Sequence, residues 1–296
     1  MRSRPGALLV GLLALVCTCA AGRAADAPIV LFDSAHHELR LEHPPTRIAS
    51  LLPSLTETVC ELQECGHLVV VDRYSNWPAS VAQLPKAGGL EDVEIEQIVS
   101  ARPDVVLVAH APRVLERLRG LGLVVFEFET QRYADIGRNV TVIGALLGVP
   151  ERAARLNRQI EDSVEEVAAA ARSRLAERAP LVYFEVDSGP YGAGPQSFIG
   201  EMLGRIGVRN ILTADLGPFP RLNPEYVVRA NPDVIFISPT EAPHLIHRPG
   251  WERIRAVREQ RICSFPPAVR DTIVRPGPRV AEGYRALTEC LLRVAP

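Results

Sequence analysis

The side chains that most often perform catalysis do not form a catalytic motif in this sequence. Ser197 is not in the context of a nucleophile elbow and has no evident base. The histidines lack the paired spacing of a zinc enzyme, since three crowd the polar N-terminal segment and the others are scattered: His36, His37, His43, His67, His110, His244 and His247. The net charge of -2, without basic clusters, argues against nucleic acid as a partner. The sequence therefore predicts a binding protein, and not an enzyme, whose partner is not nucleic acid.

Aromatic side chains occur in loops rich in proline and glycine. Tyr74 and Trp77 lie in RYSNWP, Tyr191 lies in SGPYGAGPQSF and Phe219 lies in GPFPRL. Ligands of α/β proteins bind in loops at the carboxyl ends of parallel strands, and His110, directly after a predicted strand, is a further candidate to face such a site. Exposed rings offer flat apolar area, so these loops favour a large planar ligand. The alternative is that the rings fill the cores of the lobes.

Polar candidates for ligand contact lie near the C-terminus, in DTIVRPGPRV. Asp271 and Arg275 precede a Pro-Gly-Pro turn, and Arg279 begins the last predicted helix. Asp271 could accept hydrogen bonds from ligand amides or cap a turn, and both interpretations stay open. The turn residues themselves are explained by local structure.

An internal repeat relates the two halves of the chain. Glu96 to Ala109 is EQIVSARPDVVLVA, Glu225 to Ser238 is EYVVRANPDVIFIS, and six of the fourteen aligned positions are identical. The repeat predicts two related lobes, each with a short helix, a Pro-Asp turn and a buried strand. The two leading glutamates would then hold equivalent surface positions and suit a partner with two matched cations. The alternative is that each glutamate only stabilises the first turn of its helix.

The elements that position these residues alternate between strand and helix, which predicts an α/β protein with two Rossmann-like lobes. From Pro150 to about Arg178 the chain has no further glycine or proline before Pro180 and consists of strong helix formers. Such a helix would be roughly 40 Å long and would join the lobes. We expect an N-terminal lobe over 26–147, a linking helix over 148–179 and a C-terminal lobe over 180–296. Strands are predicted at 47–52, 68–72, 104–109, 124–129, 181–187, 233–238 and 261–265.

The first 25 residues have the pattern of a secretory signal peptide. Two arginines precede an apolar run from Ala7 to Val16, and small residues follow. The run is too short to span a bilayer, so we expect an exported, periplasmic protein that begins near Asp26. Lipidation at Cys17 or Cys19 is the less favoured alternative, because the residue before each cysteine is not small.

Four cysteines remain after removal of the signal peptide, and export permits disulfides. Four cysteines allow three connectivities. We favour Cys60 with Cys65 and Cys263 with Cys290, because each pair then stays inside one predicted lobe. Free buried thiols are the alternative.

The segments RIASLLPSLTETV, RYSNWP, GLEDVEIEQIVSARPDVVLV, LNPEYVVRANPDVIFI and RPGPRV, with the long helix between them, resemble the helical-backbone (class III) solute-binding proteins of ABC importers. The resemblance covers nearly the whole mature chain. It implies a monomer without a resident cofactor that carries a small molecule between its lobes to an ABC permease dimer in the inner membrane. Glu96 and Glu225 match the positions that dock onto permease arginines.

Within this family the chain is most similar to members that bind cobalamin, which implies a corrinoid as the transported ligand. Tyr74 and Phe219 match ring contacts of those members, and Asp271 matches a polar contact. At two further contact positions those members have tryptophan, whereas this chain has Leu90 and Ala109. These departures leave the identity of the ligand open. They do not affect the expected role as a receptor.

Three alternatives are weighed against the corrinoid receptor. A haem or ferric-siderophore receptor of the same fold is the nearest, and haem would require an axial ligand such as Tyr191, Tyr74 or His110. A zinc or manganese receptor would require histidines and carboxylates converging from both lobes, and no such set can be assembled. A metal-cluster enzyme of related fold would require cysteine ligands, so disulfides between the four cysteines would exclude it.

Overall fold

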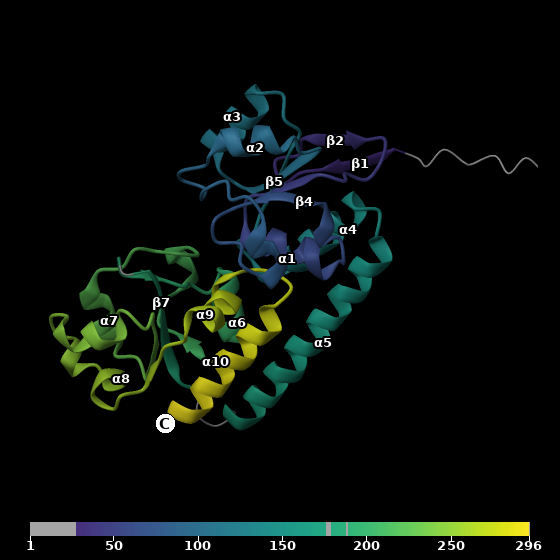
Figure 1. The fold of residues 1–296 in the computed structure, drawn as a ribbon. Coiled ribbons are helices and arrows are strands. Elements are labelled where there is room, and N and C mark those ends of the chain that lie inside the picture. Colours follow the sequence, from purple (N-terminus) through teal and green to yellow (C-terminus); the bar gives the residue numbers. More distant parts are fainter. Residues whose placement is uncertain (1–27, 176–178, 188, 296) are drawn as a thin grey trace, which may run out of the picture.

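The computed structural model describes residues 28–175, 179–187 and 189–295. The expected signal peptide and its two cysteines lie outside these residues. No helix within the described ranges is long and apolar enough to cross a membrane. The chain forms two lobes, one above the other in Figure 1, with a long helix running beside both.

The N-terminal lobe is built on a parallel four-stranded sheet with the strand order β4-β3-β5-β6. Most side chains of these strands are buried, as expected for a parallel sheet covered on both faces. The strands are β3 (Ile48–Ser50), β4 (Leu68–Val71), β5 (Val105–Ala109) and β6 (Val125–Phe128), after a hairpin of β1 (Ile29–Phe32) and β2 (Glu38–Leu41). The helices are α1 (Pro53–Glu61), α2 (Ile95–Ala101), α3 (Pro112–Gly120) and α4 (Tyr133–Leu146), with 3-10 turns η1 (Cys65–His67) and η2 (Ala79–Gln83).

The C-terminal lobe has a second sheet, in which β11, β10, β7 and β9 run parallel and β8 pairs antiparallel with β7. The strands are β7 (Leu181–Asp187), β8 (Tyr191–Gly192), β9 (Arg209–Asn210), β10 (Val234–Phe236) and β11 (Ile262–Cys263). The helices are α6 (Phe198–Arg205), α7 (Pro224–Ala230), α8 (Arg255–Arg258), α9 (Pro267–Val274) and α10 (Val280–Val294), with η3 (Ala214–Leu216), η4 (Ala242–His247) and η5 (Trp251–Arg253). All seven strands predicted from the sequence are present, each within the predicted bounds.

The position of Tyr191 differs from the expectation that this residue lies in a loop. Tyr191 instead lies in β8 and pairs with Asp187 of β7. Strands β7 and β8 are antiparallel, so their backbone groups can pair across the ladder.

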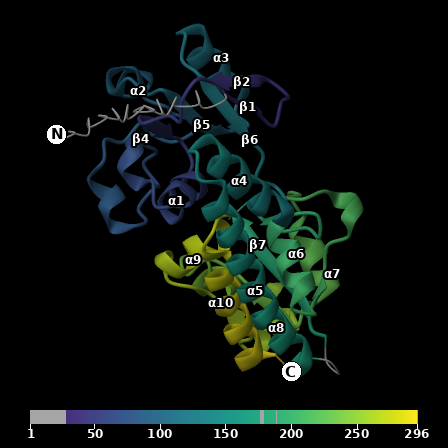
Figure 2. The ribbon, with the colours of Figure 1, turned by 90° about the vertical axis from the view of Figure 1, so that its right-hand side faces the viewer.

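The predicted linking helix is α5 (Pro150–Leu175), which has 26 residues and begins at its proline. Its buried residues recur every three to seven positions and form one stripe: Ala153, Ile160, Val164, Ala168, Ala171 and Leu175. The stripe packs against α4 of the first lobe and α10 of the second, and Figure 2 shows α5 in front of both lobes. One helix therefore links the lobes by packing on each.

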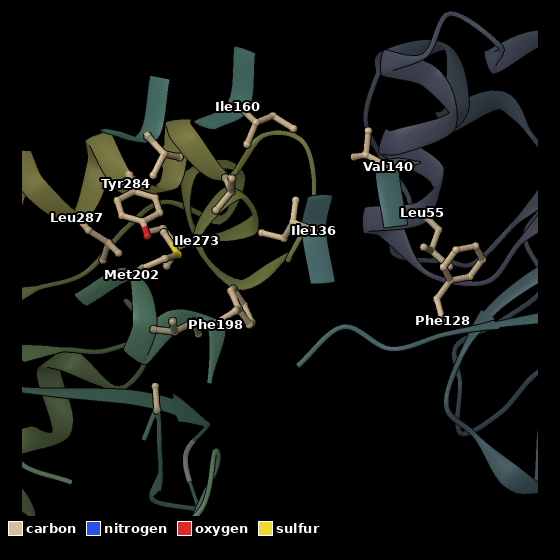
Figure 3. Close-up of a cluster of buried hydrophobic side chains, with 14 of the residues drawn as sticks. Leu55, Phe128, Ile136, Val140, Ile160, Phe198, Met202, Ile273, Tyr284 and Leu287 are labelled. Carbon is tan, nitrogen blue, oxygen red and sulfur yellow. The ribbon is translucent and has the colours of Figure 1, made fainter. Parts of the chain in front are cut away.

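A single hydrophobic core continues from one lobe into the other. Figure 3 shows Leu55 and Phe128 of the N-terminal lobe and Tyr284 and Leu287 of the C-terminal lobe, with α4 and α5 contributing side chains between them. A close-packed interior resists deformation. The shared core therefore favours small relative motions of the lobes over wide opening.

The sequence repeat is reproduced in the backbone. Helices α2 and α7 both end at a residue with left-handed backbone, Arg102 (φ 45°) and Asn231 (φ 48°). The aspartate that follows each helix ties the start of the neighbouring strand: Asp104 Oδ2 accepts the N–H of Arg47 at 2.9 Å, and Asp233 Oδ2 accepts that of Leu181 at 2.9 Å. These aspartates therefore have the structural role that turn chemistry predicted.

Both favoured disulfides are present, Cys60 with Cys65 and Cys263 with Cys290. The first closes a short loop after α1, and the second joins β11 to α10. The four cysteines of the described residues are thus all paired, which leaves no thiolate among them to hold a metal cluster.

Candidate functional site

The strands of both lobes end at cavities. One cavity of about 690 Å³ follows the ends of β3 and β4, and a second of about 510 Å³ follows the ends of β5 and β6. A third, of about 410 Å³, follows the ends of β7, β10 and β11 in the C-terminal lobe. Ligands of α/β proteins bind at such strand ends, so these cavities are the candidate binding surface.

The cavities border the contact between the lobes. Asp271 lines the cavity of the C-terminal lobe, and its Oδ2 accepts a hydrogen bond from Asn76 Nδ2, in the loop after β4, at 3.2 Å. Gln131 lines the cavity after β6, and its carbonyl accepts the backbone N–H of Phe198, in α6, at 2.8 Å. We call the three cavities together the interlobe site.

The four predicted aromatic residues are all at the surface. Tyr74 is 60% exposed and lines the largest cavity together with Leu90, and Trp77, 42% exposed, stands in the same loop. Tyr191 and Phe219 are 37% and 36% exposed on the C-terminal lobe but line none of the three cavities. The alternative that these rings fill the cores is therefore wrong, and Tyr74 is the ring best placed to meet a ligand.

His110 lies where the sequence predicted, directly after β5, and lines the cavity of about 510 Å³ with Ala109. Its Nδ1 is 2.5 Å from Oε1 of Glu127, and its imidazole is 71% exposed. The carboxylate orients the ring, which leaves Nε2 as the nitrogen that can meet a ligand.

Asp271 and Arg275 lie side by side but in different surroundings. Arg275 is 10% exposed and lines none of the three cavities. Its Nη1 donates to Glu57 Oε1 at 2.7 Å, and its Nη2 donates to Asp271 Oδ2 at 2.7 Å. The Arg275 guanidinium is therefore engaged within the protein, between the lobes, whereas Asp271 reaches a cavity wall.

Sequence reasoning missed the partner of this arginine, Glu57, whose side chain is 2% exposed on α1. Burial raises the pKa of Glu57 above its ordinary value, although the hydrogen bond and charge of Arg275 act in the opposite direction. The pair is separated by 218 residues, so no local pattern could have indicated it.

A second buried pair was also missed, at the floor of the C-terminal cavity. Arg248 donates to both carboxylate oxygens of Glu185, at 2.6 and 2.8 Å, and to Glu241 at 2.9 Å. Both glutamates line the cavity. The bidentate geometry holds Glu185 in place, as is usual for arginine with carboxylate, and a single hydrogen bond holds Glu241.

Carboxylates outnumber arginines in each cavity of the interlobe site. The cavity after β7 has Glu185, Asp187, Glu241 and Asp271 against Arg270; the cavity after β3 has Asp72, Glu91 and Asp92 against Arg73; the cavity after β5 has Glu127 and Glu129 with His110. Arg73 is itself hydrogen-bonded to Asp92. Some of these carboxylates are paired with arginines outside the lining, Glu185 and Glu241 with Arg248 and Asp271 with Arg275. Carboxylates still outnumber cations in the site as a whole, which favours donors over anions as ligand groups.

Glu96 and Glu225 lie outside the cavities. Both are exposed in the first turn of their helices, α2 and α7, which belong to different lobes (Figure 1). Glu225 is 3.8 Å from Arg229 of the same helix, whereas Glu96 has no ion pair with any residue in the described ranges. Two exposed carboxylates therefore stand at equivalent positions of the repeat.

Known proteins resemble the chain in sequence and in fold. It is 26% identical to an ABC transporter substrate-binding lipoprotein of Bacillus subtilis over 98% of each chain. It is 30% identical to a cobalamin-binding protein of Halobacterium salinarum, over 73% of this chain and 60% of that protein. The crystal structure of a periplasmic haem-binding protein from Pseudomonas aeruginosa superposes with a TM-score of 0.75 at 25% identity, over 85% and 94% of the two chains.

A family model described as periplasmic binding protein matches residues 48–269, which span both lobes and α5. The match agrees with the two-lobed fold, and with the location outside the cytoplasm that the sequence predicted. The chain therefore belongs to the periplasmic binding protein family, and it is a binding protein and not an enzyme.

Proposed function

We propose that this protein captures a cobalamin-like corrinoid at the interlobe site and delivers it to the permease dimer of an ABC importer. Substrate-binding proteins of ABC transporters bind a small molecule and act with a membrane permease. The observation that carries the choice of ligand is the composition of the site, which joins an exposed ring to an excess of carboxylates.

The charge of the site favours a ligand with neutral hydrogen-bond donors. Haem brings two propionates, and ferric siderophores are commonly anionic, so each would meet a lining in which carboxylates outnumber cations. The periphery of a corrinoid bears carboxamides, whose N–H groups donate to carboxylates. Asp271 and Glu241, which line the same cavity, are suited to accept such bonds.

The rings and volumes support a large planar ligand. Tyr74 is the most exposed of the four predicted aromatic residues, and it lines the largest cavity of the interlobe site. An aromatic face covers a flat ligand with little loss of side-chain entropy. Leu90 adds apolar surface to the same wall, where it takes the place of a larger ring.

For delivery, Glu96 and Glu225 dock on two matched cations of the permease. Their positions on equivalent helices of the two lobes let one two-subunit partner meet both at once. Such docking is electrostatic and weakens with salt, because exposed charges are screened within about 10 Å at ordinary ionic strength. The protein acts as a monomer.

A haem receptor is the second candidate, and the geometry of His110 favours it. The imidazole lies in a cavity wall, and Glu127 holds Nδ1, as second-shell carboxylates do for metal-bound histidines. Tyr74 and Tyr191 are the other side chains able to serve as an axial ligand.

Titration calorimetry of residues 26–296 with cyanocobalamin, haemin and a ferric siderophore tests the proposal. Tight one-to-one binding of the corrinoid alone is the expected result. Binding of only haemin or only the siderophore would reject the corrinoid as the ligand, but it would leave the role of the protein as a receptor unchanged.

Three variants, two at Tyr74 and one at His110, separate the candidates further. Tyr74→Ala removes the ring, and Tyr74→Phe keeps the ring but removes the hydroxyl. A corrinoid receptor is expected to lose about tenfold in affinity in the first variant and little in the second, and to tolerate His110→Ala. A haem receptor that uses either side chain as axial ligand loses binding in Tyr74→Phe or His110→Ala.

A further inference from the structure

The aromatic loop, residues 73–77, is anchored by its own lobe only as far as Ser75. Asp72 Oδ1 accepts the backbone N–H of Tyr74 at 2.8 Å, and Asp72 Oδ2 accepts the hydroxyl of Ser75. Lys86 Nζ donates to the carbonyl of Ser75 at 2.6 Å. Ser75 is buried, whereas Asn76 and Trp77 are exposed, so the rest of the loop projects beyond these anchors.

The C-terminal lobe contacts the loop on both sides of Ser75. Arg275 Nη1 donates to Asn76 Oδ1 at 2.9 Å, and Nη2 donates to the carbonyl of Tyr74 at 3.0 Å. The guanidinium of Arg279 lies over the Trp77 ring, 4.2 Å from its centroid, in a cation-π arrangement. The opposite lobe therefore holds both the backbone and a ring of the loop.

The two arginines are themselves positioned by the N-terminal lobe. Glu57, buried on α1, accepts from Arg275 Nη1 at 2.7 Å and lies 3.9 Å from Arg279 Nη1. Both arginines are largely buried, at 10% and 13% exposure. Glu57 is the buried centre of this charge cluster, in which Arg275 also pairs with Asp271 and Arg279 with Glu282. Loss of a buried partner from such a cluster weakens the position of both guanidinium groups.

The turn between the arginines is shaped to bring them there. Arg275 and Arg279 flank Pro276-Gly277-Pro278, and a Cβ on Gly277 would lie 3.1 Å from Cβ of Ser54 at the start of α1. That approach is tighter than side chains usually make, so only glycine fits without displacing a neighbour. The prolines restrict the backbone on either side.

We infer that Glu57, Arg275 and Arg279 form a clamp across the lobes that holds the tip of the aromatic loop in its ligand-facing position. These are positioning residues: they act on the ligand through the loop that carries Tyr74, which lines a cavity. The expected effect of the clamp on ligand affinity rests on the proposed function. The expected effect of the clamp on the position of the loop does not depend on any ligand.

Trp77 provides a direct reporter of the clamp. The chain has two tryptophans, and Trp251 is 0% exposed in the core of the C-terminal lobe. Quenching of tryptophan fluorescence by acrylamide therefore reports mainly on Trp77. Glu57→Gln keeps the shape of the side chain but removes its charge. The matched control is Glu64→Gln, which breaks another 2.7 Å ion pair, from the N-terminal lobe to Arg152 of α5, away from the interlobe site.

We expect the quenching constant of the ligand-free protein to rise about twofold in Glu57→Gln and to stay unchanged in Glu64→Gln, while both remain folded by circular dichroism. The dissociation constant for cyanocobalamin is expected to rise about tenfold in Glu57→Gln only, a size consistent with loss of one buried charge pair. If Glu57→Gln does not fold, Arg279→Gln is measured in its place with the same expectations; it removes the contact on Trp77, the outer charge and the ion pair with Glu282.

Two results would overturn the inference: unchanged quenching in a folded clamp variant, or increased quenching with unchanged affinity. Failure of the wild-type protein to bind cyanocobalamin is a different result. It would reject the proposed ligand, and the clamp would then be judged by the quenching alone.

Discussion

The two lobes share a sequence repeat and the backbone conformation of that repeat. The charged side chains around the repeat differ between the lobes. Asp104 is exposed and bonds mainly to backbone groups, whereas Asp233 is 7% exposed and pairs with Arg255 at 2.5 Å. Glu96 stands without an ion pair in the described ranges, whereas Glu225 has Arg229 at 3.8 Å. A repeat thus preserves turns and strand starts, since local geometry demands them, while the surroundings of each charge depend on its own lobe.

The lobes also contribute differently to the interlobe site. The N-terminal lobe supplies the aromatic loop, and the C-terminal lobe supplies the arginine turn that holds it. Neither lobe alone would present the loop as it stands. The pseudo-symmetric frame therefore carries an asymmetric site.

The largest expected effect concerns the two equivalent glutamates. Glu96→Lys combined with Glu225→Lys should lower uptake by about tenfold or more, because like charges would face the permease cations. Affinity for the ligand should not change, since neither residue lines a cavity. Uptake by cells and calorimetry measure the two quantities, with the exposed Glu116→Lys of α3 as control.

The two single charge reversals, Glu96→Lys and Glu225→Lys, test whether both lobes contribute equally to docking. Arg229 already screens Glu225 in part, so Glu96→Lys should reduce uptake more than Glu225→Lys. Wild-type uptake by the double variant would show that docking uses other residues.

The disulfides of the two lobes should differ in their contribution to stability. The Cys263–Cys290 bridge closes a separation of 27 residues, and the Cys60–Cys65 bridge closes one of 5. By loop-closure entropy the first is worth about 3.5 kcal/mol and the second about 2 kcal/mol. Denaturant unfolding of the two double-alanine variants measures both values. Equal losses would show that closure entropy does not set their contributions.

The two repeat aspartates should also differ. Asp233→Asn removes the charge of a buried carboxylate, which bonds to the backbone of Leu181 and to the half-exposed Arg255, and should lower the free energy of unfolding by about 2 kcal/mol. Asp104→Asn should cost less, because water can replace its bonds at an exposed position. Thermal unfolding of the two variants provides the test, and a larger loss for Asp104→Asn would contradict it.

The smallest expected effect is the pH dependence due to Glu57. Burial raises the pKa of this group in the folded state, against the opposing charges of Arg275 and Arg279 and with a smaller contribution from Asp271. The folded protein then binds more protons than the unfolded chain at pH values just above 4.5, so the contribution of Glu57 to stability falls as pH rises through that window. The measurement is the free energy of unfolding of the wild type minus that of Glu57→Gln, as a function of pH. This difference should fall as pH rises, and a difference that rises with pH would show that the pKa of Glu57 is not raised.

Much of the fold could be predicted because its signals are local. The apolar runs, the Pro-Asp turns and the uninterrupted helix formers of 151–175 each depend on neighbours in sequence. The same holds for Tyr74 and His110, which were found because they follow predicted strands. Tyr191 was placed in a loop, since a two-residue strand such as β8 has no periodicity to detect.

By itself, then, the sequence determined two α/β lobes, the helix between them, the equivalence of Glu96 and Glu225, and the exposed aromatic loops. Only the tertiary structure decided that Arg275 meets Glu57, that Arg248 meets Glu185, and that the three cavities share an excess of carboxylates. The physical reason is distance along the chain. Propensity and turn chemistry act over a few residues, whereas a buried charge takes whichever partner the packed lobes bring within hydrogen-bonding reach.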